Sequence, residues 1–263
     1  MPRRACRVMD RIAEATFGVA GLGPKVRPSE TWPLAHRLSQ LSPLPQPEFH
    51  FLQKLEKRKE HPVDALLLED DGSDPHPTPR IILSGWASRQ RIMADGGRQI
   101  FGFLIPGDII CGPFKSNMWA LASVVALTTV VTADVPPMGD QHPDTALASI
   151  YSKLIDLAEY ETHKLLHDQI VRLGRMNGLE RMAHLLLEFR RRLSRAGIAN
   201  EQSFPMPLRQ DVLADALGMS TVHVNRTMQQ LRHKKLISCS GGEVAILDPG
   251  RLTALAYRTA DAT

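Results

Sequence analysis

Residues 209–232 contain the pattern that most restricts how this chain can fold. A small residue, Ala214, is followed after four positions by Gly218 and after six more by Val224. The apolar residues of this segment recur at the spacing of a helix. A small residue lets two helices cross closely, a glycine allows a turn with positive φ, and a valine fills the space between the helices. The pattern predicts a helix-turn-helix. Its first helix has about nine residues, and its second begins at Ser220, a residue type that caps helix N-termini.

The second helix of this motif leaves several side chains outside its apolar seam. Such a helix fits the major groove of duplex DNA, where one guanidinium can bond both O6 and N7 of guanine. We therefore predict base contacts, with Arg226 the most important, from Thr221, His223, Asn225, Arg226 and Gln229. Residues at the edges of the motif are expected to contact the phosphate backbone. These are Arg209, Gln210, Ser220, Arg232, Lys234 and Lys235.

The segment that follows the motif, and the charge around it, favour the same interpretation. Gly241 and Gly242 join two short apolar segments, which predicts a tight hairpin and makes the unit a winged helix. Before the motif, Pro205 and Pro207 restrict FPMPL to an edge strand or an extended lead-in. Residues 171–263 hold 14 Lys and Arg against 8 Asp and Glu, whereas residues 1–170 hold 18 against 20. A polyanion is the expected partner of the C-terminal third, although a solvated basic face or a buried helical pair are the alternatives.

The N-terminal half reads as antiparallel β structure between short helices. Two amphipathic helices are predicted between Pro33 and Lys59. IILSGWASRQRIM and RQIFGFLIPGDII are predicted as strands joined by an ADGG hairpin turn, with a turn at Pro106-Gly107-Asp108 in the second segment. Ala122–Val135 is predicted as a further strand. Short strands with Gly and Pro turns predict a small barrel or jelly roll. Residues 1–30 show no clear period and are expected to be a poorly ordered extension.

A long helix is predicted from Asp144 to about Arg175. At about 1.5 Å per residue it would extend roughly 48 Å, which is too long to lie against one small barrel. We therefore expect its apolar stripe to pack on a second copy in a parallel dimer; packing wholly within one subunit is the alternative. The predicted dimer residues are Ile150, Leu154, Leu157, Leu165, Ile170 and Leu173. The breakers from Gly174 to Gly178 then predict a hinge before a second amphipathic helix that ends near Gly197.

Cysteine content and hydropathy indicate in which cellular compartment the protein is expected. The three cysteines, Cys6, Cys111 and Cys239, match neither a disulfide framework nor a zinc spacing. The sequence has no apolar run long enough for a membrane helix, and the opening segment is charged where a signal peptide would be apolar. A reducing, cytoplasmic location without membrane contact is expected.

Taken in order, the chain resembles the Crp/Fnr family of bacterial transcription regulators over about residues 31–250. The segments SGWASRQRIMADGGRQIFGFLIPGDII, SVVALTTVVTADVP, VRLGRMNGLERMAHLLLEFRRRL and ALGMSTVHVNRTMQQLRHKKLI show this resemblance. It implies an α+β fold with a double-stranded β-helix, a homodimer on a palindromic DNA site and contact with RNA polymerase. The expected parts are an extension (1–30), a sensory β-roll of cyclic-nucleotide-binding type (31–143), a dimerisation helix and hinge (144–176), a winged helix-turn-helix (177–250) and a tail (251–263).

The chain departs from the family pattern at three places. The stretch from Cys111 to Ala122 lacks the arginine that neutralises a cyclic phosphate in members of this family, so cyclic AMP is not the expected effector. Family members with an iron–sulfur cluster use four cysteines, and this chain has three. No cofactor is therefore predicted. Val222 stands where members often have an acidic residue, so the recognised half-site is expected to depart from the best-known consensus.

Weaker features of the sequence point to a metal site, a reactive cysteine or another class of protein. His163 and His167 have the spacing of a metal pair, but no third ligand at a fixed spacing is visible, so no metal site is predicted. Cys111 is interpreted as a structural thiol, with redox sensitivity as the alternative. A cupin enzyme would need histidines on strands, and residues 81–135 contain none. The chain is not predicted to be an enzyme; a partner-binding dimer with a vestigial winged helix is the other rival.

Overall fold

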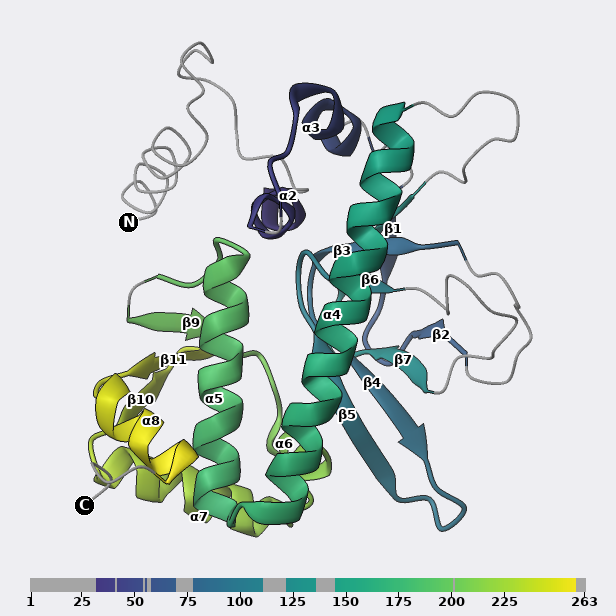
Figure 1. Ribbon diagram of the computed structural model, residues 1–263. Helices are drawn as coiled ribbons and strands as arrows, with labels where there is room; N and C mark the ends of the chain where they lie inside the picture. Colours follow the sequence, from purple (N-terminus) through teal and green to yellow (C-terminus); the bar gives the residue numbers. More distant parts are fainter. Residues whose placement is uncertain are drawn as a thin grey trace.

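The computed structural model describes residues 32–40, 42–53, 55, 58–69, 78–110, 122–135, 145–200 and 202–258. They form a β-roll, two long antiparallel helices and a small C-terminal unit of helices and strands (Figure 1). The first long helix, α4 (Thr145–Arg175), lies between the β-roll and the second, α5 (Gly178–Arg195). The predicted α+β class is confirmed. Residues 1–30, Cys111 and the rest of the stretch that lacks an arginine, up to residue 121, lie outside the described residues.

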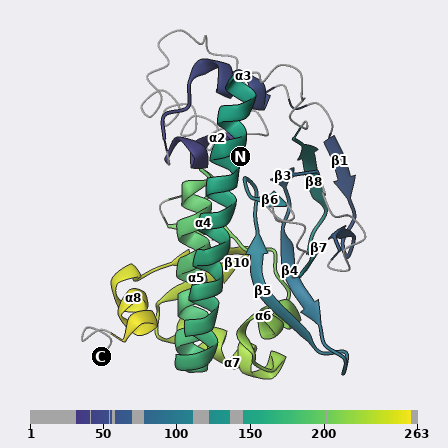
Figure 2. The ribbon, with the colours of Figure 1, turned by 45° about the vertical axis from the view of Figure 1, so that its right-hand side comes forward.

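The β-roll consists of two four-stranded antiparallel sheets. One has the order β1 (Arg58–His61), β8 (Val130–Asp134), β3 (Arg80–Ser84) and β6 (Ile109–Ile110). The other has the order β2 (Leu66–Leu68), β7 (Ser123–Ala126), β4 (Ala87–Ile92) and β5 (Arg98–Leu104). Apolar side chains between the two sheets, such as Ile82, Val124 and Val130, are buried completely. The two layers are visible in Figure 2.

Two segments that were predicted as single strands are each divided between the two sheets. The first is broken between β3 and β4 at Gly85, which has φ +86° and where a Cβ would lie 2.1 Å from the carbonyl oxygen of Thr129. The second is broken between β7 and β8 by residues 127–129. The prediction failed because alternation continues through both breaks. β1 and β2 were also missed, since they are short edge strands, and three of the four residues of β1 are charged.

Three buried apolar residues of α4 belong to the core of their own subunit. Ile150, Leu154 and Leu157 are at most 4% exposed and pack with α2 (Trp32–Ser39), α3 (Gln46–Gln53) and one outer face of the β-roll. The interpretation that these three residues contact a second copy is therefore wrong. The two short N-terminal helices cover them, and the sequence pattern could not show on which side of α4 those helices lie.

The C-terminal unit is built from β9 (Ser203–Pro205), α6 (Gln210–Leu217), α7 (Thr221–His233), β10 (Ile237–Ser240), β11 (Glu243–Ile246) and α8 (Pro249–Tyr257). α8 was predicted as part of a tail, and that prediction is wrong. Its start is marked by Asp248, whose side chain accepts a bond from the amide of Arg251, and by a proline at the first helical position. Leu252 is completely buried, and α8 packs on α5.

One apolar core joins the C-terminal unit to the β-roll. Phe189 of α5 makes edge-to-face contacts with Trp86 at 5.0 Å and Phe103 at 5.1 Å between ring centroids. These residues belong to the same buried cluster as the core of the winged helix. Among the described residues, no helix has the length and hydropathy needed to cross a membrane.

A buried network of ion pairs crosses the centre of the molecule. Arg192 of α5 contacts Asp108 at 2.6 Å and Glu188 at 3.4 Å, and its guanidinium also donates to the carbonyl of Phe103. Arg37 of α2 also binds Asp108. The network contains three cations and three carboxylates, all at most 8% exposed: Arg37, Asp108, Glu161, Arg172, Glu188 and Arg192.

The pKa of Asp108 shows how the charges of this network compensate each other. Burial alone would raise the pKa of its carboxyl, but Arg192 and Arg37 and the amide of Ile105 together hold that pKa below its usual value. The carboxylate is therefore charged in the folded protein, and it depends on both arginines.

Replacement of Arg192 by methionine should strongly destabilise the fold. Three buried carboxylates would then share two cations, with only Arg37 left for Asp108 and only Arg172 for Glu188. We therefore expect the free energy of unfolding to fall by about 3–5 kcal/mol. Urea denaturation followed by circular dichroism measures this change. The exposed Arg251 provides the control, since Arg251→Met should change stability by less than about 0.5 kcal/mol. Equal small effects of the two variants would contradict the role of the network.

Stability should also fall as the pH is lowered through about 6.5. Burial lowers the pKa of His184, and Arg172 lowers it further; burial and Lys59 lower that of His61. A histidine of the unfolded chain takes up a proton near pH 6.5, before these two do, so acid favours the unfolded state. The measurement is the urea midpoint between about pH 7.5 and about pH 5.5. His184→Gln should reduce the pH dependence, and an unchanged slope would refute this assignment.

Candidate nucleic-acid interface

The predicted helix-turn-helix is formed by α6 and α7. Gly218 ends α6 in the left-handed conformation, with φ +60°, and its amide donates to the carbonyl of Ala214. Ala214 is 5% exposed, and Val224 is completely buried between the two helices. Ala214, Gly218 and Val224 therefore have the structural roles that their spacing predicts.

Ser220 orients the start of α7. Its side chain accepts a hydrogen bond from the amide of His223 at 3.2 Å, so the predicted cap is confirmed. Within α7, Val224, Thr227 and Leu231 are buried. All five side chains that were predicted to contact bases are exposed: Thr221, His223, Asn225, Arg226 and Gln229. The helix therefore presents one continuous polar face, apart from Val222, which is 69% exposed.

His223 is the member of this face that also has a neighbour within the protein. A Cβ on Gly178, the first residue of α5, would lie 2.7 Å from Nε2 of His223. The imidazole thus lies close against the start of α5. This proximity links one predicted base contact to the connection between α4 and α5.

The wing follows α7 as predicted. β10 and β11 pair in register from Ile237 with Ile246 to Ser240 with Glu243, and both turn glycines have positive φ. β9 pairs with β11, so the proline-containing lead-in is an edge strand. Between α7 and the wing, Lys235 has φ +56°, which is uncommon for a residue with a side chain. Arg232, Lys234 and Lys235 are all exposed here.

Arg181, which the sequence reasoning did not single out, joins the helix-turn-helix to the end of α4. Its guanidinium donates to the carbonyls of Leu217 at 2.8 Å and Leu173 at 3.0 Å, and its Nε donates to Met176 at 2.8 Å. Leu217 and Leu173 lie in the last turns of α6 and α4, where carbonyls lack partners within the helix, and Met176 directly follows α4. In the sequence, an arginine in the first turn of an amphipathic helix looks like an ordinary surface residue.

The β-roll contacts the helix-turn-helix through its longest hairpin. Arg98 of β5 forms an ion pair with Asp215 of α6 at 2.6 Å, and Gln99 donates to the Asp215 carbonyl at 3.1 Å. From α4, the buried Gln169 donates to the carbonyls of Ala216 at 2.6 Å and Ile100 at 3.3 Å. α6 is thus held by polar contacts from β5 and from α4.

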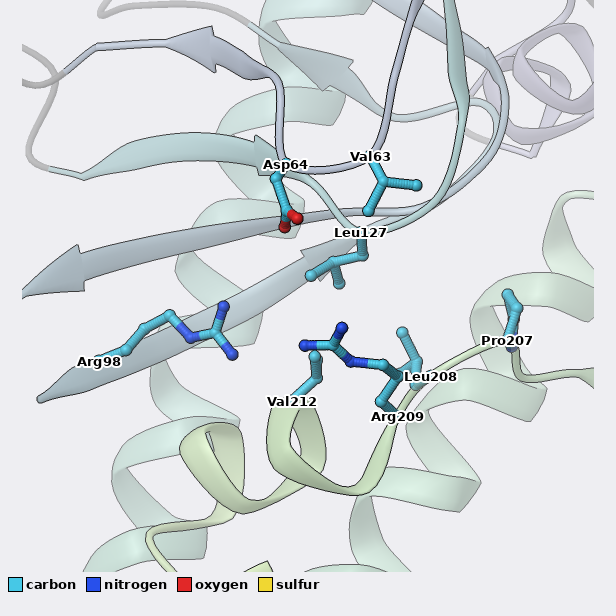
Figure 3. Close-up of a pocket in the computed structure, with 8 residues that line it drawn as sticks. All are labelled: Val63, Asp64, Arg98, Leu127, Pro207, Leu208, Arg209 and Val212. Carbon is cyan, nitrogen blue, oxygen red and sulfur yellow. The ribbon is translucent and has the colours of Figure 1, made fainter.

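A small pocket lies between the β-roll and α6 (Figure 3). Its lining includes Asp64 and Arg98 from the β-roll and Arg209 from the segment before α6, with the guanidinium of Arg209 directed across the seam. Arg209 donates to Asp211, and this bond holds the pKa of Asp211 below its usual value. The pocket volume of about 20 Å³ is enough for about one water molecule. It is a seam between two units and too small for an effector.

The comparisons with known proteins agree with this geometry. Residues 180–255 match the Crp-like helix-turn-helix domain. The chain is 33% identical to the transcriptional activatory protein AadR of Rhodopseudomonas palustris, over 74% of this chain and 79% of that protein. It is 30% identical to the nitrogen fixation regulation protein FixK of Bradyrhizobium diazoefficiens, over 66% and 72%.

Solved structures show the same fold. FixK2 from Bradyrhizobium japonicum superimposes with a TM-score of 0.61 at 21% identity, covering 76% of this chain and 96% of that one. A regulator of the CRP/FNR family from Thermus thermophilus gives a TM-score of 0.54 at 20% identity, over 76% and 98%. Together with the exposed polar face of α7 and the wing, these matches show that the chain belongs to the Crp/Fnr family and is a sequence-specific DNA-binding transcription regulator.

Proposed function

We propose that the protein binds a palindromic DNA site as a homodimer, with α7 of each subunit in a major groove. The observation on which this rests is the exposed polar face of α7, which a capped N-terminus and a buried opposite face hold in place. Two recognition helices related by twofold symmetry would meet grooves about 34 Å apart. Selection from random duplexes by the purified protein tests the proposal, and an enriched palindrome is the expected result.

The exposed residues of the motif divide into two roles. Thr221, His223, Asn225, Arg226 and Gln229 would contact base edges, and Arg226 can discriminate guanine by two hydrogen bonds. The residues at the ends of the helices would hold the phosphates: Arg209, Gln210, Ser220, Arg232, Lys234 and Lys235. Val222 offers no acceptor to the amino group of cytosine, which supports a half-site unlike the best-known family consensus.

A second copy would pack on the outer face of α4. Leu166 and Ile170 are exposed, Ile170 by 68%, on the side opposite to the residues that fill the subunit core. Leu173 continues their spacing and is half-buried, which gives the alternation of three and four that pairs parallel helices. Of the other predicted dimer residues, Leu165 lies against β5, next to Gly102. The α4 surface is thus apolar towards its C-terminal end, near the helix-turn-helix.

Each part of the chain is assigned its own function in this proposal. We assign sensing to the β-roll within residues 31–143, pairing and the hinge to residues 144–176, and DNA binding to the unit that starts at residue 177 and includes α8. The sequence between Cys111 and Ala122 supplies no arginine for a cyclic phosphate, so the effector differs from cyclic AMP. Relatives named as transcriptional activators support RNA polymerase as a further partner and a cytoplasmic setting.

Arg226→Ala should remove sequence discrimination with little effect on general DNA affinity. The loss of a paired contact to guanine costs about 1–3 kcal/mol on the selected site. Lys234→Ala serves as the contrast, since a lost phosphate contact weakens all duplexes alike and lowers the salt dependence by about one ion. Fluorescence anisotropy with the selected duplex and a scrambled one measures both. If Arg226→Ala weakened both duplexes equally, Arg226 would be a phosphate contact.

Ile170→Asp should convert the dimer into monomers. A carboxylate at the centre of an apolar pairing surface loses hydration without gaining a partner. Sedimentation velocity should show the mass of one chain, and affinity for the palindrome should fall with it. Leu247→Asp, at a 55% exposed leucine after β11, is the control and should leave the dimer unchanged. A dimeric Ile170→Asp protein would place the subunit contact elsewhere.

A further inference from the structure

Two histidines occupy the outer face of α4. His163 and His167 are both exposed and are four residues apart, so their imidazoles lie one helical turn from each other. They lie on the side of α4 away from Leu157 and Glu161, which are buried in the subunit. Neither histidine takes part in the ion-pair network or in the contacts to α6.

His163 falls in the same spacing as the apolar residues that we assign to the dimer. Positions 163, 166, 170 and 173 alternate by three and four residues, which is the repeat of a parallel helix pair. In such a symmetric pair, each position on the seam faces its own copy. His163 would therefore face the partner's His163, and the His167 side chains would flank them one turn later.

The charges around the two histidines favour a cation. Asp156 places an exposed carboxylate two turns before His163. The neighbouring cation, Lys164, bonds to Asp168 at 3.1 Å, next to the subunit core. The outer face of α4 at this level thus combines imidazole nitrogen atoms with nearby negative charge.

We propose that His163 and His167 of two subunits together bind one transition-metal ion, with Zn²⁺ as the best match. Zinc takes four ligands in a tetrahedron, and neutral imidazole nitrogen is one of its preferred donors. One chain offers two such donors, and the described residues contain no group of three or more side chains that could hold a metal. The site is complete only when the second subunit supplies the other pair, so it rests on the proposed dimer.

Metal binding at this position would couple metal concentration to subunit pairing. An ion that binds the dimer and not the separate chains favours association in proportion to its occupancy. The metal would connect the two copies of α4 about one turn before Leu166, where the apolar part of the seam begins. Zinc would thereby shift the monomer–dimer equilibrium, and the dimer is the form that places two recognition helices on DNA.

The test uses the full-length protein, freed of metal with EDTA and dialysed. Titration calorimetry with zinc chloride should give one ion per two chains. Sedimentation should show the dimer tightening by about 100-fold when free zinc is about 100 times its dissociation constant. His163→Ala and His167→Ala should each abolish both effects, and circular dichroism should confirm that these surface variants remain folded. His50→Ala, at another exposed helical histidine, should behave as the wild type.

Several results would overturn the site. These are the absence of zinc binding, a stoichiometry of one ion per chain, or binding that persists in both histidine variants. Zinc binding by the Ile170→Asp monomer with the wild-type affinity would also overturn it. A metal-free dimer that binds the palindrome but not zinc refutes the metal site alone. A chain that stays monomeric with and without zinc refutes the proposed dimer as well.

Discussion

The buried ion pairs around Arg192 are the constraint on which the arrangement of the units depends. Three arginines and three carboxylates from α2, the turn after β5, α4 and α5 meet where water is excluded. Any one of these elements that moved away would leave a charge without its partner, which is far more costly than losing a surface ion pair. Ion pairs and apolar packing together therefore hold the β-roll, α4 and α5 in place. Contacts with these elements in turn orient α6 and α7.

Local features of this fold could be predicted from sequence where one or two residues decide the conformation. Gly218 and Ser220 determine where α6 ends and α7 begins through their own backbone and side-chain bonds, so neither depends on the rest of the chain. The same holds for the double-glycine turn of the wing. α8 could have been found as well, since Asp248 followed by proline is a local start signal. The exposed face of α7 could also be predicted, because the apolar residues of the opposite face recur at helical spacing.

Features that depend on distant parts of the chain could not be predicted in this way. α4 has apolar residues on two sides, and Leu154 and Ile170 look alike in the sequence although one is buried and the other 68% exposed. Which side faces the subunit core depends on α2 and α3, more than 90 residues earlier. The contacts of Arg98 with Asp215 and of Arg181 with three carbonyls likewise join residues whose proximity is created by the fold.

These long-range contacts give the predicted hinge a different character from the one its glycines suggest. Gly174 and Gly178 would allow free rotation, but Arg181, in the first turn of α5, donates to the carbonyls of Leu173, Met176 and Leu217. Gln169 connects β5 with α6 through two hydrogen bonds. The connection therefore has a definite geometry, and a change of that geometry must break several polar bonds together. A signal that acts on β5, or on the outer face of α4, would reach α6 through these few side chains. The recognition helix would then respond to a discrete rearrangement, because partly broken polar contacts in a buried site are less stable than either complete arrangement.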